Sequence, residues 1–248
     1  MKLLFIPSWN GHLYLQEHKE TSVNILYSES LSKDKILLKI EKNNIEKTNE
    51  IIEKTVQDLN ENFLAITGDH SNTYPLVKAF KKQNLAKDFV LVIFDAHPDV
   101  EVSTVAISHE DYLRNLIEDK IIKPENIYLF GLRTFSRTEF EYLIEKKVKF
   151  WTITDILKDK DKIEKILQKI SKENEIYLSV DIDSLDPDDA PGTYYTEWCG
   201  LYIEELLEFI EIIKPKIKSA DITEYYLEKD EDEITKNNVI KLINKLNN

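Results

Sequence analysis

The segment VIFDAHPDVEV, residues 92–102, ends an apolar run with ionisable side chains at alternate positions. The run itself, 89–94, is typical of a buried strand, yet Asp95, His97 and Asp99 follow it directly. Residues i and i+2 of an extended chain share a face, so the three side chains converge if the chain stays extended through the intervening proline. Because burying unpaired carboxylates is costly, this segment predicts a cationic partner.

Three further segments place ionisable side chains directly after an apolar run. These segments are FLAITGDHS (63–71), IYLSVDIDSLDPDDAPGT (176–193) and IKSADITEYY (217–226). They contribute His70, then Asp181 with Asp183, and finally Glu224. In open α/β sheets, binding sites form beyond the carboxyl ends of the strands, so the segments predict one shared site.

Strand-like runs alternate with segments whose apolar residues recur every three to four positions, which is typical of helices. Strands are expected at 2–7, 63–67, 89–95, 127–132, 148–153, 175–183 and 217–222, with an eighth at 23–28. Helices are expected at 45–62, 74–82, 108–120, 136–147, 155–172, 203–214 and 233–246. Ser136 and Glu139 match a capping box, and Ser108 is a candidate N-cap. The alternation predicts a mostly parallel sheet of about eight strands with helices on both faces.

Composition limits the classes of function. The 248 residues, 42% of them hydrophobic, suit one α/β domain over 1–248. The net charge of −13 argues against a nucleic-acid-binding surface and favours a small cationic partner. The single cysteine, Cys199, excludes an internal disulfide and fits a cytoplasmic protein. No apolar run approaches the ~20 residues that span a bilayer, so no membrane partner is expected.

The side chains that follow the strands form a coherent set of metal ligands. The set is His70, Asp95, His97, Asp99, Asp181 and Asp183. Its four carboxylates would balance two divalent ions, and oxygen-rich ligation without a thiolate suits Mn²⁺ better than structural Zn²⁺. Two ions that share a water lower its pKa and make hydroxide available near neutral pH.

Three motifs, TGDHS (67–71), DAHPD (95–99) and SVDIDSLDPDDAPGT (179–193), resemble the signature segments of the ureohydrolases. This family includes arginase, agmatinase, formiminoglutamase and guanidinobutyrase. The resemblance runs from about Phe63 to the C-terminus and looks most like agmatinase-type members. It implies an arginase-like three-layer α/β/α sandwich, two Mn²⁺ ions per chain, and hydrolysis of a guanidinium to urea and an amine.

The resemblance also assigns roles to individual residues. By this resemblance, His70 and Asp99 bind one ion, His97 and Asp183 bind the other, and Asp95 and Asp181 serve both. Glu224 matches the acid that binds the guanidinium, and Thr193 is expected to bind substrate as well. His109 matches the histidine that transfers a proton, and Asp99 is counted with His109 and Glu224 as catalytic. Because family members often assemble, a homo-oligomer, either a trimer or a hexamer, is expected.

Some segments depart from the family pattern. The usual Gly/Pro-rich, Arg-containing segment after the first strand is replaced by the shorter SWNGHLYLQEHKETSVN, residues 8–24. The loop after the third motif reads YYTEWCGL, residues 194–201, and is bulkier than usual. The metal-binding motifs are intact while the surroundings of the pocket differ. Hydrolysis is therefore better supported than any one substrate.

Glu101 bears on the choice of substrate. It stands two residues after Asp99, where arginases place Asn to meet a substrate carboxylate and formiminoglutamases place Arg. A carboxylate there would repel a carboxylate tail, so agmatine, which yields putrescine and urea, is the expected substrate. The alternative for Glu101 is that it faces solvent. The alternatives for the chain are another ureohydrolase, acting on arginine, guanidinobutyrate or formiminoglutamate, and an inactive metal-binding homologue that regulates a partner.

The remaining polar and aromatic residues have weaker signals. The residues expected at the surface are His12 and His18. Cys199 is expected to pack within a loop, and Trp198 either walls the pocket or packs nearby. The residues expected to orient the ligands or the backbone from behind are Asp69, Asp186 and Asp221.

Overall fold

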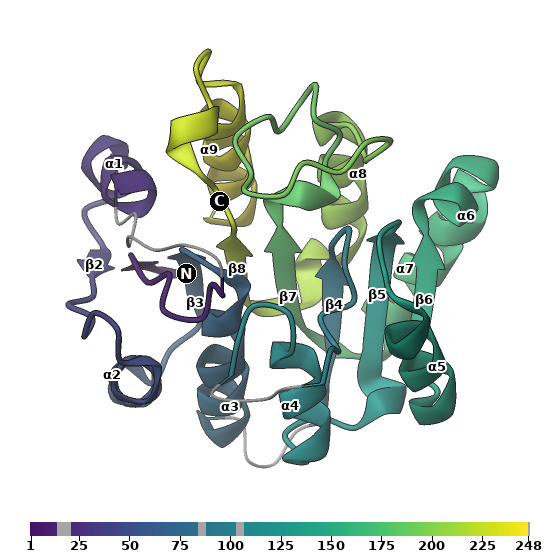
Figure 1. Cartoon of the computed structure of the whole chain (residues 1–248), viewed down its shortest axis with the longest axis horizontal. Coiled ribbons are helices and arrows are strands. Elements are labelled where there is room, and N and C mark those ends of the chain that lie inside the picture. Colours follow the sequence, from purple (N-terminus) through teal and green to yellow (C-terminus); the bar gives the residue numbers. More distant parts are fainter. Residues whose placement is uncertain (14–20, 84–87, 103–106, 248) are drawn as a thin grey trace.

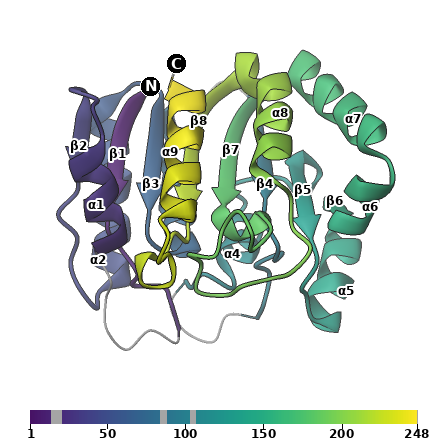
Figure 2. The same cartoon turned by 90° about the horizontal axis from the view of Figure 1, so that it is seen from above.

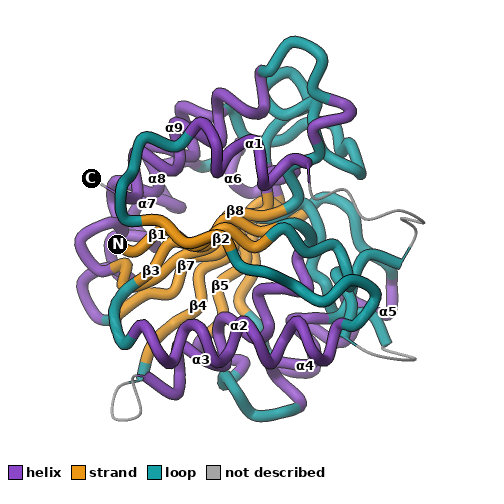
Figure 3. The backbone as a smooth tube through the Cα atoms, turned by 90° about the vertical axis from the view of Figure 1, so that its left-hand side faces the viewer, coloured by secondary structure: helices purple, strands orange, loops and turns teal. Residues whose placement is uncertain are grey.

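The structure, a computed structural model, describes residues 1–13, 21–83, 88–102 and 107–247. A central sheet lies between two layers of helices (Figure 3). Every pairing between the strands of this sheet is parallel. The predicted three-layer α/β sandwich is therefore confirmed.

The sheet contains eight strands within the described residues, in the order β2-β1-β3-β8-β7-β4-β5-β6 (Figure 1). The strands are β1 (Lys2–Ile6), β2 (Lys35–Leu37), β3 (Phe63–Thr67), β4 (Phe89–Phe94), β5 (Ile127–Leu132), β6 (Lys149–Thr152), β7 (Glu175–Asp181) and β8 (Ile217–Thr223). Every residue of β3 and β4 is buried. Burial on both faces explains why these strands read as continuous apolar runs in the sequence.

The helices form one layer on each face of the sheet (Figures 2 and 3). One layer contains α1 (Thr21–Glu29), α6 (Ile153–Lys158), α7 (Lys160–Glu173), α8 (Ile203–Ile213) and α9 (Ile234–Asn247), and the other contains α2 (Ile45–Leu59), α3 (Thr73–Gln83), α4 (Tyr112–Glu118) and α5 (Arg137–Lys146). Successive residues of β7, Tyr177 and Leu178, enter the two opposite cores. Within the described ranges, no helix is long and apolar enough to cross a membrane.

One expected strand is wrong, because residues 23–28 lie in helix α1. Val23 and Leu26 are both buried there, and a spacing of three places them on one face of a helix. The edge strand is β2 instead, which pairs with β1 over three residues. So short a strand shows too little periodicity to be recognised in the sequence.

The segment 155–172, expected as one helix, belongs to two. The side chain of Asp159 accepts a hydrogen bond from the backbone N–H of Lys162 and begins α7 just after α6 ends. The capping box at the start of α5 is confirmed, because the Ser136 and Glu139 side chains each accept a hydrogen bond from the other residue's backbone N–H. Local capping by side chains therefore sets these helix boundaries.

Gly68 allows the ends of three strands to approach one another. A Cβ atom on this residue would lie 2.0 Å from the backbone oxygen of Ser8, so a larger residue would force the segment after β1 to move. The Gly68 oxygen accepts a hydrogen bond of 2.7 Å from the backbone N–H of Glu224. Gly68 thus holds the segments that follow β1, β3 and β8 together at the carboxyl edge of the sheet.

Candidate functional site

The predicted metal ligands all lie at the carboxyl edge of the central strands. His70 follows β3, then Asp95, His97 and Asp99 follow β4, and Asp181 and Asp183 stand at the end of β7. Strands β3, β8, β7 and β4 are consecutive in the sheet although they are far apart in the sequence. The sheet order therefore brings these side chains into one place, as the sequence predicted.

One group of ligands surrounds His70. Its Nδ1 lies 3.1 Å from Asp95 Oδ2, 3.1 Å from Asp99 Oδ2 and 3.2 Å from Asp181 Oδ2. All four residues are buried. One ring nitrogen thus faces three carboxylate oxygens that come from two different strands.

A second group surrounds His97. Its Nδ1 lies 2.9 Å from Asp183 Oδ2 and 3.8 Å from Asp95 Oδ1. Asp95 therefore directs one carboxylate oxygen to each group, which would suit a ligand that two cations share. Asp181 belongs to the first group, and its Oδ1 accepts a hydrogen bond of 2.8 Å from the backbone N–H of Asp183.

The chain does not reach this arrangement by remaining extended, so that part of the expectation is wrong. Strand β4 ends at Phe94, and Asp99 has a φ of 50°, in the left-handed region that non-glycine residues rarely adopt. Glu224 has a φ of 68°. Backbone strain of this kind is concentrated at functional sites. A bend after β4, and not a longer strand, brings Asp99 back towards His70.

The tautomer of His70 can be assigned from its surroundings. Ser179 Oγ donates a hydrogen bond of 2.6 Å to Asp221 Oδ1, so the same oxygen accepts from His70 Nε2 at 3.0 Å. In the neutral ring, Nδ1 then carries the lone pair and faces the carboxylates. His70 Nδ1 and Asp95 Oδ2 are both buried without a hydrogen bond among the described residues. Two acceptors that face each other in this way fit a cation between them.

Burial and mutual repulsion alter the pKa values of the carboxyl groups. Burial, followed by the Asp99 and Asp183 carboxylates, raises the pKa of Asp95 to about 7. Burial and the Asp183 carboxylate raise the pKa of Asp181 well above its usual range. Burial raises the pKa of Asp183 too, but the His97 imidazole, the Arg133 guanidinium and the backbone N–H of Ala96 together outweigh it and lower the pKa of Asp183 to about 2. The site is short of positive charge, and four carboxylates with two imidazoles fit two divalent cations.

A small cavity joins the ligand groups to the other predicted site residues. Its lining comprises His97, Asp99, His109, Asp181, Asp183, Thr193, Tyr194, Tyr195 and Glu224. Thr193 Oγ1 donates a hydrogen bond of 2.6 Å to the backbone oxygen of Tyr195, so its hydroxyl also shapes the loop. His109 lies in the turn before α4, which begins at Tyr112. The expectation that Ser108 caps this helix is wrong, because Asp111 occupies the N-cap position. The predicted catalytic and substrate-binding positions thus adjoin the predicted ligands.

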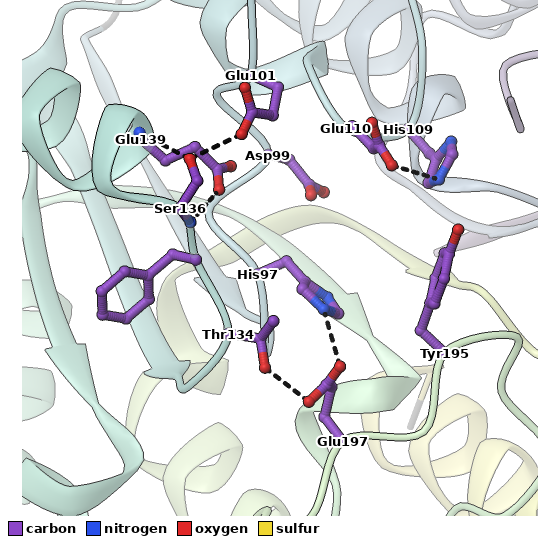
Figure 4. Close-up of a pocket in the computed structure, with 11 residues that line it drawn as sticks. His97, Asp99, Glu101, His109, Glu110, Thr134, Ser136, Glu139, Tyr195 and Glu197 are labelled. Atoms are coloured by element: carbon purple, nitrogen blue, oxygen red, sulfur yellow. Dashed lines mark hydrogen bonds and ion pairs between the residues drawn. The ribbon is translucent and has the colours of Figure 1, made fainter.

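A wider pocket of about 440 Å³ opens beside this cavity (Figure 4). Its lining comprises His97, Asp99, Glu101, His109, Glu110, Thr134, Phe135, Ser136, Glu139, Tyr195 and Glu197. Glu101 accepts a hydrogen bond of 2.7 Å from Ser136 Oγ, so it lies in the pocket wall. The described lining includes four glutamates and neither lysine nor arginine. The pocket therefore favours a positively charged occupant.

Glu197 is a pocket residue that the sequence did not single out. Its Oε2 accepts a hydrogen bond of 2.6 Å from Thr134 Oγ1, and its Oε1 lies 3.6 Å from His97 Nε2. A carboxylate on this side of the ring can orient an imidazole whose other nitrogen faces Asp183. The sequence feature that could have identified Glu197 as a pocket residue was its position in the bulky loop after the third motif.

Three of the weaker expectations are wrong. His12 is buried and not at the surface, and its ring stacks on that of His109 at 4.2 Å. Cys199 is exposed instead of packed. Trp198 is 72% exposed and lies outside the pocket lining. His18 lies outside the described residues.

The three aspartates expected to orient the ligands or the backbone each accept hydrogen bonds. Asp221 accepts the hydrogen bond from Ser179 described above, and Asp69 Oδ1 accepts from the backbone N–H of Ser71 at 2.9 Å. Asp186 accepts a hydrogen bond of 3.0 Å from the backbone N–H of Gly200. The first two brace the segment of His70, whereas Asp186 shapes the loop that carries Glu197.

We expect Ser179→Ala to weaken divalent-cation binding about 10- to 100-fold, because His70 would lose the hydrogen bond that holds its tautomer. Calorimetric titration of chelator-treated protein with Mn²⁺ measures the affinity for the cation. Ser219→Ala is the matched control, since this buried hydroxyl on β8 accepts a hydrogen bond from the backbone N–H of Phe63, which is not a predicted ligand. Equal affinities in the two variants would show that Ser179 does not orient His70.

Comparisons with known proteins agree with this geometry. A family model described as the arginase family matches residues 13–247. The agmatinase of Bacillus subtilis (strain 168) is 30% identical over 190 residues, which cover 74% of this chain and 62% of that protein. The solved structure of Entamoeba histolytica arginase in complex with L-ornithine has a TM-score of 0.85 at 25% identity, covering 98% of this chain and 97% of that one.

A solved formimidoylglutamase from Bacillus subtilis also shares the fold, with a TM-score of 0.87 at 22% identity, covering 98% of this chain and 84% of that one. The aligned part spans less than two thirds of the length of the Bacillus agmatinase. The similar proteins thus differ in the activity for which they are named. The family match nevertheless covers nearly the whole sequence, from 13 to 247. The chain belongs to the arginase family.

Proposed function

We propose that this chain is a dinuclear metal hydrolase that cleaves a guanidino compound to urea and an amine, and that agmatine is its preferred substrate. The observation that carries the proposal is the pair of histidine–carboxylate groups that share Asp95 and adjoin the buried carboxylate of Glu224. Membership of the arginase family and 30% identity to an agmatinase support it.

In this proposal the six predicted ligands would hold two ions. His70 and Asp99 would bind one ion, His97 and Asp183 would bind the other, and Asp95 and Asp181 would serve both. The donor set contains oxygens and imidazole nitrogens without a thiolate, which favours Mn²⁺. Bound divalent ions lower the pKa of a water, so that hydroxide becomes available near neutral pH.

Glu224 is the residue proposed to receive the guanidinium group. Its Oε1 accepts a hydrogen bond of 2.8 Å from the backbone N–H of His70, which fixes the carboxylate beside the ligands. Burial, followed by the Asp181 and Asp69 carboxylates, raises the pKa of Glu224 well above its usual range. A permanently charged guanidinium would favour the ionised carboxylate and could donate to it through parallel hydrogen bonds.

His109 is proposed to supply the proton that the leaving amine needs. It is buried, and it lines the small cavity together with Glu224 and Thr193. Its Nε2 lies 3.8 Å from Glu110 Oε1, at the border of the wider pocket. Among the described residues, His109 belongs to neither group of ligands, which fits a role in proton transfer and not in metal binding.

The glutamates of the wider pocket support a cationic tail on the substrate. Glu101, Glu110 and Glu197 would each repel a carboxylate tail. Like charges a few ångströms apart at an effective dielectric constant of ~20 repel by several kcal/mol before screening. Agmatine lacks the carboxylate of arginine and carries a second positive charge. The net charge of −13 attracts cations from a distance as well.

Two alternatives predict different behaviour. Another ureohydrolase would prefer arginine, 4-guanidinobutyrate or formiminoglutamate to agmatine. An inactive regulatory homologue would bind the ions and hydrolyse none of these compounds. A panel of substrates therefore separates the alternatives, provided that metal content is measured on the same samples.

We expect the Mn²⁺-loaded protein to release urea from agmatine with a higher kcat/KM than from arginine or 4-guanidinobutyrate. Glu224→Gln should keep its bound metal and lower turnover ~10²-fold or more, because it loses the charge that meets the guanidinium. Glu145→Gln, an exposed change on α5, is the matched control and should behave as wild type. A fully metallated wild type that hydrolyses nothing in the panel would favour the inactive homologue.

Glu101→Gln should reduce the preference for agmatine over 4-guanidinobutyrate by about 10-fold, equivalent to about 1.4 kcal/mol. The reason is that the variant removes a negative charge from the pocket wall without changing its shape. Ratios of kcat/KM for the two substrates, with Glu145→Gln as control, provide the measurement. An unchanged ratio would show that Glu101 does not determine which substrate tail the pocket prefers.

A further inference from the structure

The ring of His109 is held by the segment that follows β1. Its Nδ1 lies 3.0 Å from the backbone oxygen of Gly11, and its backbone N–H donates to the same oxygen at 3.1 Å. A carbonyl oxygen can only accept a hydrogen bond, so Nδ1 carries the proton in the neutral ring. Nε2, the nitrogen on the side of Glu110, is then the one that takes up and gives back a proton.

His12 covers one face of this ring. The two ring centroids are 4.2 Å apart and the ring planes differ by 9°. His12 is only 6% exposed. Burial, and to a lesser degree the neighbouring His109, lowers the pKa of His12 to about 3. His12 therefore stays neutral and does not add a second charge when His109 becomes protonated.

The segment that carries His12 is tied to the chain on both sides of a proposed metal ligand. The backbone N–H of Gly11 donates to Asp69 Oδ2 at 2.9 Å, while Asp69 Oδ1 accepts from the backbone N–H of Ser71 at 2.9 Å. A Cβ atom on Gly11 would lie 2.2 Å from Ser71 Oγ, so this close approach requires glycine. Asp69 and Ser71 flank His70, which couples the position of the stack to that of the ligands.

Two tyrosines of the bulky loop complete the enclosure. The Tyr194 ring meets the His12 ring edge-on at 4.3 Å. Tyr195 lies nearly parallel to His109, at 6.3 Å between centroids, and its ring stands opposite His109 in the pocket (Figure 4). Tyr194 also packs against Tyr226, which follows β8. Three segments that are distant in the sequence thus form the aromatic surroundings of His109.

We propose that His12 is a positioning residue, which holds the plane of the His109 ring while the Gly11 carbonyl fixes its tautomer, so that Nε2 exchanges the proton. The inference rests on the proposed function, because it concerns the support of the proposed proton donor. A group held in its reactive orientation needs no reorganisation during the reaction, and a displacement of about 1 Å can cost ~10²-fold in rate.

Two variants at His12 test this role in the Mn²⁺-loaded protein. His12→Ala removes the stacked ring and should lower kcat for agmatine about 10- to 100-fold, with a smaller change in KM and no loss of metal. His12→Phe keeps a flat, neutral ring and should restore most of kcat. The positioning role is wrong if His12→Ala keeps its kcat, if kcat and metal content fall together, or if His12→Phe is as slow as His12→Ala.

Nitrogen-15 spectra of the imidazole rings test the same inference without turnover. The chain has five histidines, so the His109 signals are assigned by their loss in His109→Asn. With Zn²⁺, a d¹⁰ and therefore diamagnetic ion, in place of Mn²⁺, wild type and His12→Phe should show the Nδ1–H tautomer of His109, whereas His12→Ala should show a mixture. An Nε2–H tautomer in wild type would overturn the inference even if agmatine is hydrolysed. If no guanidino compound is hydrolysed, the proposed function fails, and the spectra still decide whether His12 positions His109.

Discussion

The constraint on which the rest of the site depends is the convergence of buried carboxylates at one edge of a parallel sheet. Asp95 and Asp181 meet around His70, where burial and like charge raise the pKa of both carboxyl groups. The adjacent order of β3, β8, β7 and β4 forces this meeting. Such an arrangement is costly in the absence of positive charge, and a pair of divalent cations relieves it. In the proposed account, the cationic partner expected from the segment after β4 is therefore a metal ion.

The supports around the ligands explain how the arrangement is held in place. Ser179 and Asp221 fix the tautomer of His70, and the Gly11 carbonyl fixes that of His109. Each imidazole therefore presents one defined nitrogen to the site. The segments that depart most from the family pattern, after β1 and after the third motif, meet over His109. In the proposed account, the chain keeps the common chemistry and encloses it with different residues.

The sheet and the convergence of the proposed ligands could be predicted from the sequence because both follow from local patterns. Buried strands read as apolar runs, and the carboxyl ends of parallel strands meet, so side chains distant in the sequence could be expected at one place. The burial of His12 could not be predicted, because it depends on Tyr194 and Tyr195 packing from a remote loop. Strand β2 is too short to show a period. The place of Glu197 depends on contacts with residues distant in sequence, Thr134 and His97 among them.

The metal content of the protein tests the central claim most directly. The measurement is elemental analysis after chelation and reconstitution with excess Mn²⁺, made on wild type and on Asp181→Ala together with the melting temperature. The account predicts near two equivalents per chain in wild type and a clear loss in Asp181→Ala. Bound metal should also stabilise the fold, by about 2.7 kcal/mol for each site at a free ion concentration of 100 times Kd. A wild-type protein that takes up no divalent ion, or that hydrolyses its substrate fully without one, would contradict the account.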